Sequence, residues 1–315
     1  MRKVIGIGET VLDIIFRSNK PISAVPGGSV FNSMISLGRC GVKATIISEA
    51  GDDRIGRLTI DYLESNNVDS SNICVHKGTK SPLSLAFLNE KNDAEYIFYK
   101  DHPNDRLDFL CPDIQQDDII LFGSYYAVNP VIRQHVRSIL EKAKERKAII
   151  YYDVNFRPSH AGEIMKLTPN ILENFEFADI VRGSNEDFKV LYNIDSADKI
   201  YKSEISFYCK KFIYTNSNNP IVLHADNGFR KEYPLKPLET VSTIGAGDNF
   251  NAGIVYGLIS YGITKEDIEN GPDEKTWDKL IACAEMFSAD CCKSIDNSVS
   301  WDFGKNNKIK TTIEL

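Results

Sequence analysis

The 315-residue sequence predicts an α/β fold, with a doubly wound, mostly parallel β-sheet flanked by helices and a small β-sheet lid. Short β-branched runs alternate with amphipathic stretches of helical length, which is the pattern of a parallel sheet covered on both faces. One segment breaks this alternation and has the pattern of a hairpin. The hydrophobic content of 42% is sufficient for one large core.

The strands are predicted from short apolar runs that contain many β-branched and aromatic residues. These runs are Val4–Ile7, Ala44–Ile47, Ile119–Phe122, Ala148–Tyr152, Phe212–Tyr214 and Ile221–Leu223. Ligands of parallel sheets bind beyond the carboxyl ends of the strands. Polar residues that directly follow these runs are therefore candidates for a binding site.

Three helices are predicted from apolar residues at helical spacing. The first has apolar positions from Val30 to Leu37 and lies between a glycine pair and Gly41. The second covers residues 55–63, and the third covers residues 250–258 after a glycine-rich turn. Glycine after the last apolar position is a common helix stop.

The hairpin is predicted within residues 81–103, where Leu83–Leu88 and Glu95–Tyr99 have strand character and a turn-rich stretch joins them. With the polar stretch 14–26 it is expected to form a small sheet that serves as a lid. The alternative is a hairpin at the edge of the main sheet. Because no repeat or linker is evident, residues 1–315 are predicted to be a single domain.

Charge and cysteine content exclude several classes of protein. With 37 Lys and Arg against 44 Asp and Glu, the net charge is negative, so the chain has no general electrostatic attraction to nucleic acid or to an anionic membrane. The seven scattered cysteines favour reduced thiols in the cytoplasm, with Cys291 and Cys292 buried on a late helix. The N-terminus has no apolar run of the length of a signal peptide or membrane span. We therefore expect a cytoplasmic protein.

The strongest chemical signal is the run STIGAGDNFNAG at residues 242–253. Gly245, Ala246 and Gly247 precede a helix, so their backbone N–H groups and the helix N-terminus can form an anion hole. Asp248 follows directly, where a base could deprotonate an attacking alcohol, and the helix terminus favours its ionised form. An ordinary N-cap after a glycine turn would have a similar sequence.

A second cluster follows the first strand. Asp13 provides a carboxylate, Gly27 and Gly28 provide bare backbone, and Asn32 provides an amide on the first turn of a helix. Such groups suit a polyhydroxylated ligand, since each can pair with a hydroxyl in a defined direction. Alternatively, Asp13 caps a turn and Asn32 is a solvated helix residue.

These two clusters resemble the two signatures of the ribokinase (PfkB-type) carbohydrate kinases. Gly27 to Gly41 is similar to the N-terminal signature, Ser242 to Val255 is similar to the C-terminal signature, and the resemblance covers nearly the whole chain. It implies a ribokinase-like fold and transfer of the ATP γ-phosphoryl group to a hydroxyl of a small carbohydrate. It also implies that Mg²⁺ accompanies ATP.

The resemblance assigns roles residue by residue. The residues implied in catalysis are Asp248, Gly245, Ala246, Gly247 and Arg157. Those implied in sugar binding are Asp13, Gly27, Gly28, Asn32, Phe98, Lys100, Asp153 and Asn155. Those implied in ATP binding are Ser184, Asp187, Thr215, Ser217 and Asn251, with Asp187 reaching Mg²⁺ through water.

The sequence departs from the family pattern at two places. The metal-ordering Asn-x-x-Glu appears as Ser184-x-x-Asp187, or in a register that starts at Asn185. The nucleotide loop Thr-x-Gly-x-x-Gly is Thr215 to Pro220 here, without the glycines that let backbone approach a nucleotide. We therefore expect altered ATP binding, with a catalytically silent sugar-binding or regulatory homologue as the alternative.

The substrate is predicted from similarity within the family. Ser29 stands where ribokinases carry lysine, whereas Asp153-x-Asn155-x-Arg157 looks more like fructokinases and 2-keto-3-deoxygluconate kinases. We expect a fructokinase, with the second activity or another PfkB sugar kinase as alternatives. Many relatives dimerise through the lid, so a homodimer through the lid is also expected.

Overall fold

The computed structural model describes residues 2–88, 94–101, 112–217 and 219–309. The chain divides into two compact units. Unit 1 comprises Met1–Leu110, Glu239–Gly262 and Asp278–Leu315, and unit 2 comprises Cys111–Leu238 and Ile263–Trp277. The prediction of one domain over residues 1–315 stays a prediction, and each unit is described by itself.

Unit 1 contains parallel strands covered by helices. β1 (Val4–Ile7) pairs with β4 (Ala44–Gly51), and β4 also pairs with β5 (Val68–Asp69) and β6 (Ile73–His76). The helices are α1 (Ser29–Arg39), α2 (Arg54–Ser65), α8 (Ala246–Ser260), most of α10 (Glu274–Cys291), and α11 (Trp301–Asn306). The three helices predicted from apolar spacing are α1, α2 and α8, so these predictions are confirmed.

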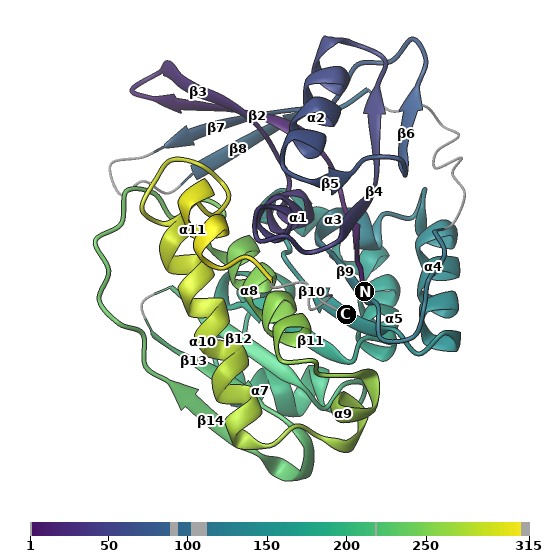
Figure 1. The fold of residues 1–315 in the computed structure, drawn as a ribbon, viewed down its shortest axis with the longest axis vertical. Helices are drawn as coiled ribbons and strands as arrows, with labels where there is room; N and C mark the ends of the chain where they lie inside the picture. The colour runs from purple at the N-terminus through teal and green to yellow at the C-terminus, as the bar shows by residue number, and fades with distance from the viewer. Residues whose placement is uncertain (1, 89–93, 102–111, 218, 310–315) are drawn as a thin grey trace, which may run out of the picture. The chain divides into compact units, whose positions relative to one another are not determined.

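The small sheet is separate from the main strands, in the order β3-β2-β7-β8 (Figure 1). Its strands are β2 (Val11–Arg17), β3 (Lys20–Gly27), β7 (Leu83–Leu88) and β8 (Ala94–Tyr99). β7 pairs antiparallel with β8 and parallel with β2, which confirms the hairpin and excludes the edge of the main sheet. The predicted lid also includes residues 89–93 and 102–103, which lie outside the described residues.

Unit 2 contains the remaining main strands. β9 (Ile119–Gly123), β10 (Ile149–Asp153), β11 (Ile180–Ser184) and β12 (Phe212–Asn216) are parallel neighbours. β13 (Asn219–His224) and β14 (Arg230–Tyr233) extend this sheet antiparallel. The helices are α3 (Ser124–Val128), α4 (Arg133–Glu145), η1 (Pro158–Glu163), α5 (Ile164–Phe177), α6 (Asn185–Tyr192), α7 (Ala197–Ile200), η2 (Tyr201–Ile205), η3 (Asp226–Gly228) and α9 (Lys265–Asn270).

The observed elements confirm the predicted α/β class, with mostly parallel main strands flanked by helices. All six predicted strands are present, whereas the sequence prediction missed β5, β6, β11 and β14. In β11, Arg182 and Ser184 interrupt the apolar pattern. Cys291 and Cys292 are buried, and the six cysteines in the described residues are free thiols. Across the described part of the chain, no helix has the length and apolar character needed to cross a bilayer.

Candidate active site

The predicted anion-hole turn lies at the start of α8. Gly245 is the N-cap residue, with φ of 78° and ψ of −3° in the left-handed region. A Cβ atom there would lie 2.7 Å from the carbonyl oxygen of Asn297, so the turn requires glycine for both conformation and space. The Ala246 amide donates to the Thr243 carbonyl at 3.2 Å. The turn therefore places backbone amides of residues 245–247 at a helix N-terminus.

Asp248 lies on the first turn of α8, only 9% exposed. Asn32 on α1 donates from Nδ2 to Asp248 Oδ2 at 2.8 Å, and Ser33 Oγ donates to the Asp248 carbonyl at 2.7 Å. Two residues of α1 thus hold both the carboxylate and the backbone of Asp248. The two signatures, which are more than 200 positions apart, meet at this hydrogen bond within unit 1.

Asp13 on β2 is 8% exposed and opposes Val25 of β3. A Cβ atom on Gly27 would lie 2.2 Å from Asp13 Oδ2, so the carboxylate occupies the space that a side chain at residue 27 would need. Gly28 is the N-cap residue of α1. Asn297 donates from Nδ2 to Asp13 Oδ2 at 3.3 Å. The structure therefore brings together the Asp13 carboxylate and the glycine pair of the predicted sugar site, and the backbone amide of Asn32 donates to the Gly28 carbonyl at 2.8 Å on the first turn of α1.

Phe98 lies on β8 of the small sheet, and Lys100 directly follows that strand. Lys100 Nζ lies 2.7 Å from Glu9 Oε2 and 5.3 Å from the centre of the Phe98 ring. Glu9 follows β1, so this ion pair joins the hairpin to the end of the first strand within unit 1. Contact of Phe98 and Lys100 with a sugar stays a prediction.

In unit 2, a buried arginine that sequence reasoning missed joins three strand ends. Arg182 on β11 donates from Nη1 to Asp153 Oδ1 at 2.9 Å and from Nη2 to Thr215 Oγ1 at 2.6 Å. Burial alone would lower the pKa of Arg182, but the charges of Asp153 and Asp187 raise it above its usual value. We call Asp153, Arg182, Asp187 and Thr215 the arginine cluster. The signal in the sequence that could have identified Arg182 is its position as a charged residue directly after the apolar residues Ile180 and Val181.

Asp187 caps α6 together with Ser184. Its Oδ2 accepts from the Ser184 amide at 2.6 Å and from Ser184 Oγ at 2.8 Å, while Oδ1 accepts from the Phe156 amide at 2.8 Å. Burial raises the pKa of Asp187 and the charge of Asp153 adds to this, whereas Arg182 and Ser184 oppose it. Phe188 is fully buried, as the Ser184-x-x-Asp187 register expects.

The remaining predicted residues of unit 2 lie on the segments that follow strand ends. Asn155 is buried with φ of 36°, an uncommon conformation for a non-glycine residue that tends to occur at functional sites. Arg157 is exposed at the start of η1, and Ser217 is exposed in the turn between β12 and β13. Asn218 of this altered loop lies outside the described residues. In unit 1, Asn251 on α8 is buried.

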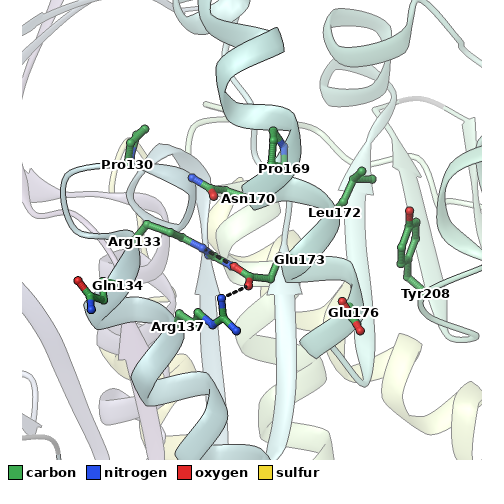
Figure 2. Close-up of a pocket in the computed structure, with 10 residues that line it drawn as sticks. All are labelled: Pro130, Arg133, Gln134, Arg137, Pro169, Asn170, Leu172, Glu173, Glu176 and Tyr208. Carbon is green, nitrogen blue, oxygen red and sulfur yellow. Dashed lines mark hydrogen bonds and ion pairs between the residues drawn. The ribbon is translucent and has the colours of Figure 1, made fainter.

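A cleft of about 680 Å³ in unit 2 contains none of the predicted site residues (Figure 2). Its lining residues are Pro130, Arg133, Gln134, Arg137, Pro169, Asn170, Leu172, Glu173, Glu176 and Tyr208. Arg133 Nε donates to Glu173 at 2.8 Å, and Arg137 Nη1 lies 3.2 Å from the same carboxylate (Figure 2). An anionic ligand would have to displace Glu173, so we do not place phosphate chemistry in this cleft.

Comparison with protein families matches residues 1–293 to the description "pfkB family carbohydrate kinase". The chain belongs to this family of carbohydrate kinases. The predictions of an ATP-dependent sugar kinase and of a family resemblance over nearly the whole chain are thereby confirmed.

Curated relatives of this kinase are distant in sequence. It is 26% identical over 247 residues to 5-dehydro-2-deoxygluconokinase of Geobacillus thermodenitrificans, covering 74% of this chain and 72% of the relative. It is 24% identical over 298 residues to fructokinase-1 of Oryza sativa, covering 91% and 90%. The two relatives have similar identities but different names, so these comparisons do not identify the sugar substrate of this kinase.

Solved structures confirm the ribokinase-like fold of this kinase. Fructokinase from Vibrio cholerae, with fructose, ADP and calcium bound, has a TM-score of 0.81 at 18% identity, covering 96% of each chain. Aminoimidazole riboside kinase from Salmonella enterica has a TM-score of 0.80 at 20% identity, covering 97% of this chain and 99% of its own. The likeness extends over both units.

Proposed function

We propose that this kinase is a fructokinase, which transfers the γ-phosphoryl group of ATP to a hydroxyl of fructose with Asp248 as the base. The observation that carries the proposal is the hydrogen bond from Asn32 to the Asp248 carboxylate at 2.8 Å, on the first turn of the helix that Gly245 caps. An oriented carboxylate beside a helix N-terminus suits deprotonation of an alcohol next to an anionic group.

In the proposed reaction, the sugar hydroxyl gives its proton to Asp248 as its oxygen forms a bond to the γ-phosphorus. The bond between the γ-phosphorus and the bridging oxygen breaks, and ADP leaves with that oxygen and the electron pair. Negative charge on the transferred group is stabilised by the backbone amides and the helix N-terminus around residues 245–247. Asp13 and the bare backbone of Gly27 and Gly28 bind other sugar hydroxyls.

Mg²⁺ is proposed to enter with ATP and to neutralise phosphate charge. Among the described residues, no group of three or more His, Cys, Asp or Glu is arranged to hold a metal ion. Asp187 is 4% exposed, and its oxygens already accept hydrogen bonds from Ser184 and the Phe156 amide. This chain therefore fits contact with the metal through water at Asp187 better than direct ligation.

Fructose is preferred over an acidic sugar because of charge. Asp13 and Asp248 are both carboxylates, and they would repel a sugar carboxylate bound between them. Lys100 and Arg157 are the predicted partners for such a carboxylate, and Lys100 is already paired with Glu9 at 2.7 Å. The similarity to 5-dehydro-2-deoxygluconokinase supports an acidic keto-sugar as the second candidate.

The test is ADP release by the purified protein with ATP and Mg²⁺, measured across a sugar panel. The panel contains fructose, ribose, 5-dehydro-2-deoxygluconate and 2-keto-3-deoxygluconate. We expect the highest kcat/KM with fructose. A preference for an acidic sugar would reject the fructokinase assignment, and sugar binding without ADP release would favour the silent homologue.

We also propose that the kinase forms a homodimer through the small sheet. β8 is at the edge of that sheet, and its Ile97 and Tyr99 are 44% and 55% exposed. Exposed apolar side chains on an edge strand favour pairing with a second chain. Light scattering of the purified protein is expected to give twice the mass of the monomer.

A further inference from the structure

Two asparagines in unit 1 have the same unusual hydrogen bonding. Asn32 donates from Nδ2 to Asp248, and Asn297 donates from Nδ2 to Asp13. Each side chain is 4% exposed, and each Oδ1 is buried without a hydrogen-bond partner among the described residues. Buried polar atoms in folded proteins nearly always have partners, so such exceptions need an explanation. We call Asp13, Asn32, Asp248 and Asn297 the acceptor cluster.

Loose packing does not explain the unpaired oxygens, because the side chains of Ser36 and Asn249 next to them are satisfied. Ser36 Oγ donates to Asn249 Oδ1 and accepts from the Val299 amide. Asn249 Nδ2 donates to the carbonyl oxygens of Gly245 and Asn297 at 2.8 and 2.9 Å. The backbone of Asn297 is therefore anchored to the turn that begins α8, while its side chain reaches Asp13.

The chemistry of the cluster defines the ligand that would complete it. Carboxylates and amide oxygens accept hydrogen bonds, so the missing partner must donate several. Ser29 adds a further buried oxygen without a partner, its Oγ at the start of α1. Neighbouring hydroxyls of a neutral sugar provide such donors, whereas a sugar carboxylate provides none and would be repelled by Asp13 and Asp248.

We propose that Asn297 is a specificity-determining residue of the acceptor site, which holds Asp13 through Nδ2 and accepts a hydrogen bond from one sugar hydroxyl through Oδ1. This inference rests on the proposed function and extends it to a residue outside both family signatures. Because Asn297 does not contact Asp248 or the phosphoryl group in this scheme, it acts on sugar binding and not on the chemical step.

The first test is Asn297→Ala, with Asn66→Ala as the matched control in the same unit. Asn66 is 2% exposed and satisfied, since its Oδ1 accepts from Arg39 at 2.6 Å and its Nδ2 donates to the Tyr62 carbonyl at 2.7 Å. We expect Asn297→Ala to raise KM for fructose about 10- to 100-fold, as for loss of a hydrogen bond that orients a charged group. Its kcat should stay within roughly threefold and its Tm within about 2 °C.

Asn66→Ala should behave in the opposite way, with a lower Tm and an unchanged KM, because it leaves a buried donor of Arg39 unpaired. If Asn297→Ala instead lowered Tm and left KM unchanged, Asn297 would be a structural residue and the inference would be wrong. Should Asn297→Ala not fold, Asn297→Ser, which keeps a short polar side chain, is measured in the same way.

The second test uses fructose analogues that each lack one hydroxyl. The wild-type enzyme should bind several of these analogues more weakly than fructose. In Asn297→Ala, this difference in affinity from fructose should disappear for one analogue only. That analogue identifies the hydroxyl bound by Oδ1. Penalties that are the same in both proteins for every analogue would overturn the inference.

The two proposals fail in different ways. If the wild type releases no ADP with any sugar of the panel, the fructokinase proposal is wrong, but the fructose-induced rise in Tm can still be compared between wild type and Asn297→Ala. A rise in the wild type that is lost in the variant supports the role of Asn297. No rise in either protein overturns both proposals.

Discussion

The acceptor cluster of unit 1 and the arginine cluster of unit 2 are both buried and polar, but their hydrogen bonding differs. In the arginine cluster, Arg182 binds Asp153, and both oxygens of Asp187 accept hydrogen bonds from protein groups. In the acceptor cluster, Asn32 and Asn297 each leave an oxygen without a partner. In the arginine cluster, Arg182 Nε is the buried atom without a hydrogen-bond partner among the described residues, but the charge of Arg182 is paired with the aspartates. Opposite charges that are paired within the protein stabilise the fold, whereas buried acceptors without a donor are suited to a ligand. Substitutions in the two clusters should therefore affect different properties.

The largest effect is expected from Asp248→Asn, which should reduce kcat by about 10²- to 10⁴-fold, the contribution of a general base. The asparagine retains an oxygen that can accept from Asn32, so fructose binding and Tm should be nearly unchanged. Steady-state ADP release and calorimetry of fructose binding provide the measurements. Retained turnover would remove Asp248 from the mechanism.

Arg182→Met should mainly affect stability. Removing the guanidinium leaves Asp153 and Asp187 as buried charges without their shared cation, a change that typically costs about 3–5 kcal/mol. Urea unfolding monitored by fluorescence measures this cost.

The control is Arg137→Met, whose ion pairs with Glu141 and Glu173 involve a side chain that is 54% exposed. Exposed ion pairs contribute little, so its unfolding midpoint should be close to that of the wild type. Equal midpoints for the two variants would show that Arg182 does not hold the arginine cluster together.

Gly245→Ala and Gly262→Ala form a matched pair within unit 1. Both glycines have left-handed φ, 78° and 65°, so alanine should cost about 1–2 kcal/mol at either position. Only at Gly245 would the new Cβ collide with protein, since no atom lies within 4 Å of a Cβ on Gly262. The Gly245 variant should therefore be less stable and less active than the Gly262 variant. Identical Tm and kcat values would argue against the close approach of Asn297.

The smallest effect is expected at the N-cap of α2. Asp53 accepts from the Gly56 amide at 2.9 Å and from Ser81 Oγ at 2.7 Å. Burial alone would raise the pKa of Asp53, but these hydrogen bonds lower it overall. Asp53→Ala should cost about 1 kcal/mol at neutral pH, the usual loss for an N-cap.

The pH dependence of this loss follows from the lowered pKa. The stabilisation by Asp53 is complete above the ordinary aspartate pKa of about 3.9 and disappears as the pH falls through the folded-state value. The Tm difference between wild type and Asp53→Ala should therefore shrink on acidification. Asp52→Ala, at the exposed neighbouring residue, is the control. A difference that does not change with pH would contradict the role of the Asp53 carboxylate.

Sequence alone was sufficient to identify six strands of the main sheet, three helices, the hairpin and the candidate residues Asp13, Asn32 and Asp248. Local information determines these features, since apolar spacing specifies buried faces and small residues before a helix specify an amide-rich turn. The missed strand β11 illustrates the limit, because Arg182 is a polar interruption in sequence but pairs with Asp153 once buried.

Tertiary structure alone decided which residues meet. Nothing local to residues 293–300 indicates that Asn297 reaches Asp13, 284 positions away, or that Asn32 binds Asp248. Such contacts depend on how helices and strands pack, because a hydrogen bond requires donor and acceptor to lie close together and well aligned. Sequence therefore determined the elements and the candidate chemistry, whereas packing determined which polar atoms are satisfied by the protein and which are left for a ligand.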